Sequence, residues 1–278
     1  MKKIIVNGKI IDETSNIIDA NNRGLKFADG VFETIRVEKS IPYMWHEHLA
    51  RLNNGLSITE IKCDTENLYQ ECLELLQANN QKDAILRVMV TRGGKSKGYL
   101  PIDDSESLTI IQSMDLPSYN MEMVNLWVGS YKKIPSACLP PNVKYNQAMH
   151  SILSKIEAEE NNCFESLVLN IDESISETCS GNIFWIKDDE LYTPSIECNI
   201  LPGTMREAIL RLLGAAVKEG VFYLDDLKNA SEVFITNSVW KIQKISSIEP
   251  LGYSYQNGIY ANKILKRIEE NIKNYAVY

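Results

Sequence analysis

A lysine that follows a stiff loop is the first residue of this sequence with clear chemical potential. Lys144 comes directly after residues 138–143, which include two adjacent prolines, and shortly before a predicted helix at 147–160. A lysine held on a rigid segment can be buried, and burial lowers the pKa of its ammonium group, which frees an amine for Schiff-base chemistry. Taken alone, Lys144 also fits the commoner case of a surface lysine at a helix start, so its role depends on what accompanies it.

A carboxylate and a glycine-containing helix start follow further along the chain. Glu177 ends a predicted strand and precedes small polar residues, among them Ser180 and Asn182, which leave room for a ligand and can hydrogen-bond to it. Residues 201–206, Leu-Pro-Gly-Thr-Met-Arg, open a predicted helix. Free N–H groups at a helix N-terminus bind phosphate, and a glycine lets the ligand approach closely. An ordinary Pro-Gly turn would look the same, so neither segment identifies a site by itself.

The spacing of the residues does not match a Walker phosphate loop or a histidine metal site. A Walker phosphate loop that ends in residues 94–96 would need glycine at position 89, which is Met89. His46 and His48 are two positions apart, so on a helix they point in different directions, and His150 is the one other histidine of the sequence. No feature marks any histidine as part of a Ser-His-Asp or Cys-His arrangement. The sequence therefore predicts no metal site and no histidine-based triad.

The composition is that of a globular protein. The chain has 278 residues, of which 44% are hydrophobic and 24% charged, enough for one large or two modest domains. A net charge of −8 argues against a broad nucleic-acid-binding surface. The six cysteines include no Cys-x-x-Cys pair, and no stretch reaches the roughly 18 apolar residues that span a membrane. We therefore expect free thiols and a cytoplasmic protein without a membrane or nucleic-acid partner.

Alternating strands and helices must position the residues above. In the first part, strands are predicted at 3–6, 9–11, 32–37, 41–45, 84–91 and 107–112, and helices at 46–56 and 66–77. In the second part, strands are predicted at 124–131, 166–170, 174–178, 183–186, 190–193 and 232–236, and helices at 147–160, 204–219, 225–230 and 257–274. The many short strands of the second part favour a barrel-like sheet. We predict an α+β chain with a smaller N-terminal domain over 1–115, a linker over 116–122 and a larger C-terminal domain over 123–278.

The order of these pieces resembles that of the class IV aminotransferases, which are pyridoxal-phosphate enzymes of fold type IV. The resemblance lies in Lys144, in residues 177–194 (ETCSGNIFWIKDDELYTP) and in residues 201–206 (LPGTMR). In the first half, residues 23–36 (RGLKFADGVFETIR) resemble the family's entry motif, and residues 48–52 (HLARL) its H-x-x-R-L signature. The similarity covers essentially the whole chain. It implies a two-domain, homodimeric enzyme that holds pyridoxal 5'-phosphate between its domains.

The resemblance also assigns roles to individual residues. Lys144 would hold the cofactor as a Schiff base and later move a proton. Glu177 would pair with the pyridine nitrogen and keep it protonated, so that the ring acts as an electron sink. Arg51 would bind the phosphate. The further cofactor contacts that the family implies are Ser180, Asn182, Leu201 packed on the ring, the backbone of Thr204 and Met205, and Ser238.

Substrate-facing positions separate the members of the family. Branched-chain enzymes typically place a tyrosine where this chain has Met149, and D-amino-acid enzymes typically place Arg and His at the positions of Lys97 and Tyr99. The latter also often carry Tyr in place of Phe32. Aminodeoxychorismate lyases typically show R-G-x-G-x-x-G-Y, which residues 92–99 (RGGKSKGY) resemble in length and in the final Gly-Tyr.

The resemblance therefore favours a lyase that converts 4-amino-4-deoxychorismate into 4-aminobenzoate and pyruvate in folate synthesis. Phe32, Lys97 and Tyr99 would then face the substrate. An aminotransferase for D- or branched-chain amino acids, with a 2-oxo acid as acceptor, is the alternative. A non-catalytic dimer that binds the cofactor is a more remote one.

Overall fold

The chain folds into two compact units. The computed structural model describes residues 1–278 except for 19, 95, 103–106, 119–121, 257 and 273–278. One unit comprises Met1–Ser118 together with Val143–Gln147, and the other comprises Tyr119–Asn142 together with Ala148–Tyr278. The division after Ser118 falls within the stretch 116–122 that we predicted as a linker, of which 119–121 lie outside the described residues. Val143–Gln147 differs from the prediction, because it was expected in the C-terminal domain and belongs to the first unit.

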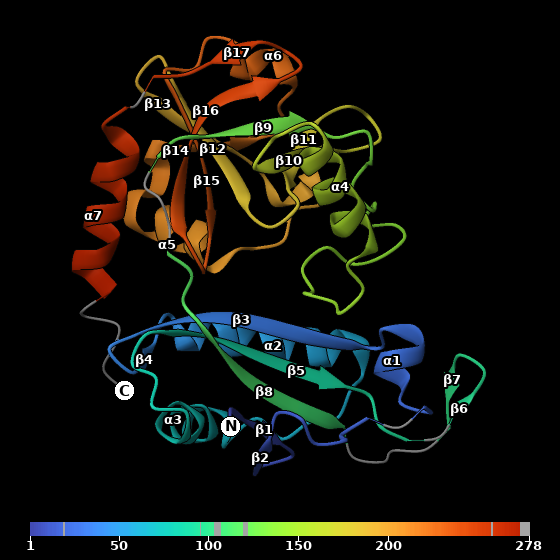
Figure 1. Cartoon of the computed structure of the whole chain (residues 1–278). Coiled ribbons are helices and arrows are strands. Elements are labelled where there is room, and N and C mark those ends of the chain that lie inside the picture. The colour runs from blue at the N-terminus through green and yellow to red at the C-terminus, as the bar shows by residue number, and fades with distance from the viewer. Residues whose placement is uncertain (19, 95, 103–106, 119–121, 257, 273–278) are drawn as a thin grey trace. The chain divides into compact units, whose positions relative to one another are not determined.

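The first unit is built on a six-stranded antiparallel sheet in the order β2-β1-β8-β5-β3-β4 (Figure 1). Its strands are β1 (Lys3–Val6), β2 (Lys9–Asp12), β3 (Gly30–Glu38), β4 (Ile41–Pro42), β5 (Ala84–Thr91) and β8 (Leu108–Asp115). A separate hairpin consists of β6 (Ser96–Lys97) and β7 (Leu100–Pro101). The helices are α1 (Arg23–Phe27), α2 (Trp45–Thr59) and α3 (Leu68–Ala78).

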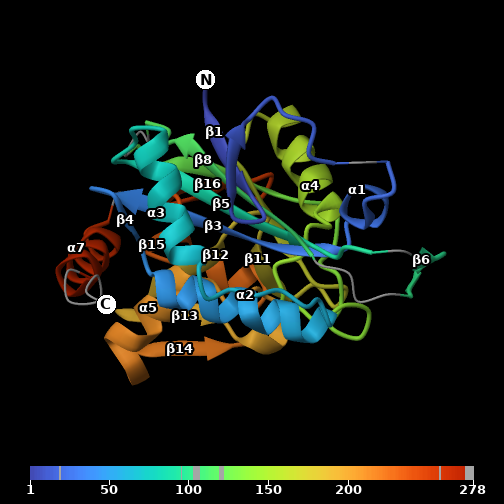
Figure 2. The ribbon, with the colours of Figure 1, turned by 90° about the horizontal axis from the view of Figure 1, so that it is seen from below.

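Two helices cover the sheet of the first unit. Helix α2 packs against β3, and α3 packs against β1 and β8 (Figure 2). Along β3, the alternating residues Val31, Ile35 and Val37 are buried in one core with Leu52 and Leu56 of α2. Side chains of a strand alternate between its two faces, so every second residue of β3 is directed to the helices. These contacts fix β3 and α2 against each other, and both carry predicted site residues.

The second unit contains a larger mixed sheet that curls toward a barrel, as the short strands predicted (Figure 1). Its order is β11-β10-β9-β16-β15-β12-β13-β14, and β17 pairs with β16. The strands are β9 (Val124–Val128), β10 (Glu165–Leu169), β11 (Ile175–Thr178), β12 (Asn182–Lys187), β13 (Glu190–Pro194), β14 (Val217–Gly220), β15 (Glu232–Asn237), β16 (Lys241–Glu249) and β17 (Tyr253–Ser254). The helices are α4 (Met149–Glu160), α5 (Thr204–Leu213), α6 (Leu224–Leu227) and α7 (Tyr260–Ile272), with short 3-10 turns at Ile196–Cys198 and Gly214–Ala216.

Strand β12 lies in the middle of this unit and is buried on both faces. Ile183 and Trp185 enter one core with Ile235 of β15. On the opposite face, Phe184 stacks on Phe234 with the ring centroids 5.3 Å apart. The near-continuous apolar run of β12 thus reflects a strand covered from two sides, and it gives the site residue at its start a rigid support.

Several predicted helices differ from the structure at their ends, most of all the one predicted at 204–219. The predicted helix at 204–219 stops at Leu213, because Gly214 with φ of 53° ends it and the chain then turns into β14. Strand β14 pairs in parallel with β13, and this long-range pairing was not visible in the local pattern. The predicted helix at 257–274 begins at Tyr260, and its residues 257, 273 and 274 lie outside the described part of the chain. No helix in the described part of the chain has the length and apolar character needed to cross a bilayer.

Candidate functional site

The predicted site residues are divided between the two units, and each group is described within its own unit. The first unit holds Phe32, Arg51, Lys97, Tyr99 and Lys144. The second unit holds Glu177, Ser180, Asn182, Leu201, Thr204, Met205 and Ser238.

Lys144 lies on a short segment that pairs with the edge of β3. The backbone N–H of Phe32 donates to the carbonyl oxygen of Lys144 at 3.0 Å, and the N–H of Asn146 donates to that of Gly30 at 2.9 Å. A Cβ atom at Gly30 would lie 2.4 Å from Asn146 Nδ2 and 2.5 Å from the carbonyl oxygen of Val90, so this close approach requires glycine. Strand pairing therefore holds Lys144 in place, in addition to the proline-rich loop that precedes it.

The ring of Phe32 lies close to two cations. Lys144 Nζ is 4.5 Å from the ring centroid, and the Arg87 guanidinium carbon is 4.6 Å from it. Arg87 is on the neighbouring strand β5, opposite Thr34. Its Nε is buried without a hydrogen-bond partner, and burial lowers the pKa of Arg87. Among the described residues, no acidic group pairs with Arg87.

Arg87 is not among the site residues predicted from the sequence. The available signal was a single arginine inside the otherwise apolar stretch 84–90 (AILRVMV), which is a buried strand. Burial of an arginine without a partner costs free energy, so a single arginine in a buried strand indicates a functional role.

The guanidinium of Arg51 forms hydrogen bonds with the buried carboxylate of Glu33 in the first unit. Arg51 Nε and Nη2 donate to the two oxygens of Glu33 at 2.8 and 2.7 Å, and His48 Nδ1 lies 2.7 Å from Glu33 Oε2. Burial alone would raise the pKa of Glu33, but Arg51 and then His48 lower it to about 2. Burial lowers the pKa of His48, against the opposing effect of Glu33. The fork of Arg51 is thus fixed by Glu33, and its binding of a phosphate stays a prediction.

Lys97 and Tyr99 belong to the hairpin of β6 and β7, which projects from the first unit (Figure 1). The Tyr99 side chain is 83% exposed, and its ring contacts that of Phe27 at a centroid distance of 5.3 Å. Lys97 is exposed as well. Within a single chain these two residues are therefore not buried with Phe32, and their role toward a substrate stays a prediction.

Glu177 lies one residue before the end of β11 in the second unit and accepts three hydrogen bonds from described residues. Its Oε2 accepts from Asn182 Nδ2 and from the backbone N–H of Leu201, both at 3.0 Å. Its Oε1 accepts from Lys133 Nζ, with which Glu177 forms an ion pair. These bonds fix the plane of the carboxylate from three directions. Lys133 was not part of the predicted site.

Asn182 joins the loop that carries Glu177 to the start of helix α5. Besides Glu177, its Nδ2 also donates to the carbonyl oxygen of Leu201 at 2.9 Å. Gly203, the residue before α5, packs so closely that a Cβ atom there would lie 2.1 Å from Asn182 Oδ1. No side chain of the described residues caps the N-terminus of α5, and Thr204 and Met205 at this end are buried. The arrangement presents backbone N–H groups of the first turn of α5 beside the Glu177 loop.

Ser180 and Ser238 lie on two turns that Asn237 connects. Asn237 Nδ2 donates to the carbonyl oxygen of Ser180 at 3.2 Å, and its Oδ1 accepts from the N–H of Val239 at 2.9 Å. The hydroxyl of Thr236, next to Asn237, is buried and has no hydrogen-bond partner among the described residues. The second unit thus brings the three predicted segments around 177–182, 201–205 and 238 together.

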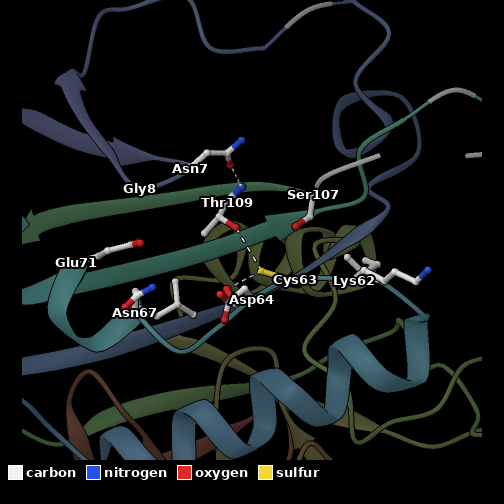
Figure 3. A pocket seen from close by; sticks show the side chains of 11 residues that line it. Asn7, Gly8, Lys62, Cys63, Asp64, Asn67, Glu71, Ser107 and Thr109 are labelled. Atoms are coloured by element: carbon white, nitrogen blue, oxygen red, sulfur yellow. Dashed lines mark hydrogen bonds between the residues drawn. The ribbon is translucent and has the colours of Figure 1, made fainter. Parts of the chain in front are cut away.

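A separate pocket lies in the first unit, and Figure 3 shows its lining. It has a volume of about 690 Å3 and is bordered by Asn7, Cys63, Glu71 and Thr109, among others. Thr109 holds two of its walls together, since its N–H donates to Asn7 Oδ1 at 2.8 Å and its hydroxyl lies 3.5 Å from the thiol of Cys63. None of the predicted site residues borders this pocket, so it is distinct from the site described above. Over the described residues, no cluster of His, Cys, Asp or Glu could hold a metal ion.

Comparison with known proteins assigns the chain to a family. A family model for amino-transferase class IV matches residues 30–248, which span most of both units. The chain belongs to this family. Class IV aminotransferases use pyridoxal 5'-phosphate, so the cofactor and the expectation of a transaminase or lyase are confirmed for the family.

Individual class IV relatives carry different names. A protein of Methanocaldococcus jannaschii, provisionally named a branched-chain-amino-acid aminotransferase, is 30% identical over 98% of this chain and 96% of its own length. An aminodeoxychorismate lyase of Bacillus subtilis is 27% identical over 98% of this chain and 95% of its own. The solved structure of the Escherichia coli branched-chain amino acid aminotransferase matches with a TM-score of 0.90 and 24% identity, over 97% of this chain and 94% of that one. The last comparison confirms the two-domain α+β fold.

The donors of the second unit fit the cofactor of the family. The uncapped start of α5, with glycine before it, suits a phosphate group. Glu177 offers a fixed carboxylate for a ring nitrogen, and the hydroxyl of Thr236 is a buried polar atom in need of a partner. A carboxylate, backbone N–H groups and a buried hydroxyl are thus in place for a phosphorylated, nitrogen-containing ring.

Proposed function

We propose that the chain attaches pyridoxal 5'-phosphate to Lys144 and acts on an amine that carries a carboxylate. Its specific reaction is that of an aminodeoxychorismate lyase, which releases pyruvate and 4-aminobenzoate. The observation that carries the proposal is the fixed position of Lys144, paired through its backbone to β3 with its amine over Phe32. Arg87 lies on the same ring, and no acidic group of the described part of the chain pairs with it, which supports an acidic substrate.

In this proposal, each residue of the site has a separate role in the reaction. When bound, the cofactor supplies an electrophilic carbon for the substrate amine and a ring that accepts an electron pair. With the cofactor bound, the free amine of Lys144 would remove the proton from the carbon next to the substrate nitrogen. In the second unit, Glu177 would hold the ring nitrogen and the first turn of α5 would bind the phosphate; Arg51 of the first unit keeps its predicted role as a phosphate ligand. Arg87 orients the substrate through its carboxylate.

The family also contains transaminases, and the relative from M. jannaschii supports that alternative. Lyase and transaminase share the first proton removal by Lys144. They differ in the next step. In the lyase, the bond between the substrate ring carbon and the enolpyruvyl oxygen would break, and the leaving enolate would take up a proton to become pyruvate. In a transaminase, Lys144 would return the proton that it removed, and no carbon–oxygen bond would break. Met149 in place of a tyrosine and Lys97 in place of an arginine support the lyase over the branched-chain and D-amino-acid transaminases.

The visible absorbance of the cofactor-loaded protein separates the alternatives. We expect a band from the Lys144 linkage that D-alanine, L-glutamate and branched-chain L-amino acids leave unchanged, and release of pyruvate and 4-aminobenzoate from aminodeoxychorismate. Conversion of the band by one of these amino acids, without 4-aminobenzoate formation, would replace the lyase by a transaminase. Absence of any band after reconstitution would refute the Lys144 assignment as a whole.

The proposal includes a homodimer in the cytoplasm, as the family resemblance implies. Tyr99, Leu100 and Ile102 are apolar side chains with 83%, 63% and 56% of their surface exposed. A second copy that covers these residues would remove them from water and place Lys97 and Tyr99 in a buried setting.

A further inference from the structure

Glu177 is held by a lysine to which the proposed reaction gives no role. Lys133 forms an ion pair with Glu177, and the two side chains are only 13% and 8% exposed. The backbone N–H of Lys133 donates to the carbonyl oxygen of Leu169 at 2.9 Å, which fixes the residue beside the end of β10. Lys133 is therefore a largely buried partner of Glu177 with a fixed backbone position.

The hydrogen bonds of Glu177 leave one acceptor position open. A carboxylate offers about two acceptor positions on each oxygen. Oε2 uses both, with Asn182 Nδ2 and the N–H of Leu201. Among the described residues, Lys133 is the one donor to Oε1. Any further donor, such as a protonated ring nitrogen, must therefore bond to Oε1, the oxygen that Lys133 already holds.

We infer that Lys133 is a positioning residue that presents Oε1 of Glu177 to the ring nitrogen of the cofactor and limits how strongly this nitrogen retains its proton. The inference rests on the proposed function, in which Glu177 pairs with that nitrogen. Two cations, the ammonium of Lys133 and the protonated ring, would share one oxygen. Like charges at such close range disfavour each other, so the Lys133 charge opposes protonation of the ring while its hydrogen bond orients the acceptor.

The other described charged groups near Glu177 form no ion pair with it, so we assign the effect on ring protonation to Lys133. Burial and then Lys133 lower the pKa of His150 to about 4, so His150 is neutral at pH 7. Glu165, on the adjacent strand β10, accepts a hydrogen bond from the Ser180 hydroxyl. Lys155 donates to the backbone carbonyl of Phe164. Within the described residues, Lys133 is the one cation in an ion pair with Glu177.

The protonation of the ring nitrogen can be followed without turnover. Protein loaded with pyridoxal 5'-phosphate that carries 15N in the ring is titrated with pH, and the 15N chemical shift gives the midpoint of ring protonation. Lys133→Gln keeps a donor for Oε1 and removes the charge. We expect its midpoint to rise by about one pH unit or more, the usual effect of a like charge at short range. Lys132→Gln is the matched control, because Lys132 pairs with the exposed Glu173 at 2.6 Å, and its midpoint should equal that of the wild type.

Two further variants make the outcome decisive. Glu177→Gln should lower the midpoint, and if it leaves the midpoint unchanged, the pairing of Glu177 with the ring fails and with it that part of the proposed function. If Glu177→Gln lowers the midpoint but Lys133→Gln matches Lys132→Gln, the role of Lys133 is refuted while Glu177 keeps its own. Lys133→Arg retains the charge and should keep the wild-type midpoint. If Lys133→Gln does not fold, a rise in the Lys133→Arg midpoint would overturn the inference by itself.

Discussion

Single residues in this chain are held in place by partners that a motif does not reveal. The signature at 48–52 pointed to Arg51, but Glu33, which grips its guanidinium, lies on another element. Lys133 holds Glu177 in the same way across 44 positions of sequence. Such partners follow from tertiary contacts. The sequence therefore leads to a proposal for the residues that touch the cofactor, but it does not reveal the residues that orient them.

Arg87 is the residue to which we assign the substrate carboxylate. Arg87→Gln removes the cation and keeps a polar side chain, so we expect the KM for the carboxylate substrate to rise by about tenfold or more, with a smaller change in kcat. Arg36→Gln is the control, because Arg36 on the adjacent strand already pairs with Glu38 at 2.6 Å. Steady-state kinetics of both variants test the assignment. An Arg87→Gln enzyme with the KM of the control would speak against it.

Glu33 should make stability depend on pH in acid. Its pKa is lowered from an ordinary 4.5 to about 2, so its stabilisation is complete above pH 4.5 and is lost as the pH falls from 4.5 toward 2. The shift corresponds to about 3 kcal/mol. Glu33→Gln should therefore lower the free energy of unfolding at pH 7 by roughly this amount and flatten its dependence on pH below 4.5.

Urea unfolding at a series of pH values measures this effect. Glu38→Gln serves as the control on the same strand, since its ion pair with Arg36 is partly exposed and should contribute less than about 1 kcal/mol. Equal unfolding free energies for the Glu33 and Glu38 variants at pH 7 would show that the Glu33 cluster does not stabilise the fold as described.

At the scale of elements, local sequence patterns predicted most helices and strands. The helices α2 and α3 and the strands β3, β5 and β12 follow from apolar spacing and composition. The main error was at 217–219, which the amphipathic pattern of α5 extended into a helix. There Gly214 ends the helix and pairing with β13 makes a strand, a long-range contact that overrides local preference.

Gly203 connects two elements of the site and allows a test at this scale. Gly203→Ala would place a Cβ atom 2.1 Å from Asn182 Oδ1, so the start of α5 must move away from the Glu177 loop. We expect the affinity for pyridoxal 5'-phosphate to fall by about tenfold or more and the free energy of unfolding to drop by about 1–3 kcal/mol.

The control for this variant lies at the other end of the same helix. Gly214 has a φ of 53°, and a Cβ atom there would have no neighbour within 4 Å, so Gly214→Ala strains the backbone without touching the site. It should lower stability and leave cofactor affinity unchanged. Titration of both variants with pyridoxal 5'-phosphate measures the two affinities. Equal affinities would show that Gly203 does not shape the phosphate site.

At the scale of the whole molecule, the division into two parts was foreseen and the position of the lysine was not. The pattern break near 116–122 marked the boundary, because linkers differ in composition from the elements they join. Val143–Gln147, by contrast, returns to the first unit through strand pairing with β3, although both its flanks belong to the second. Pairing between residues more than a hundred positions apart leaves no local signal, so the sequence alone did not group Lys144 with the first unit.

The exposed hairpin leads to a prediction about assembly. Sedimentation velocity should give a particle of twice the chain mass of 31.6 kDa. Leu100→Asp places a charge on the hairpin and should weaken association by about tenfold or more, whereas Ile10→Asp, at an exposed apolar residue of β2, should not. A wild-type protein that sediments as a monomer at all concentrations would exclude the proposed dimer.

The central claim is that Lys144 carries the cofactor, and peptide mapping tests it most directly. The loaded protein is treated with borohydride, which makes a Schiff-base linkage permanent, and the modified peptide is located by mass spectrometry. We expect the cofactor on Lys144 and no covalent label in Lys144→Ala, with Lys132→Ala labelled like the wild type. A label on another lysine, or an unchanged label in Lys144→Ala, would contradict the account.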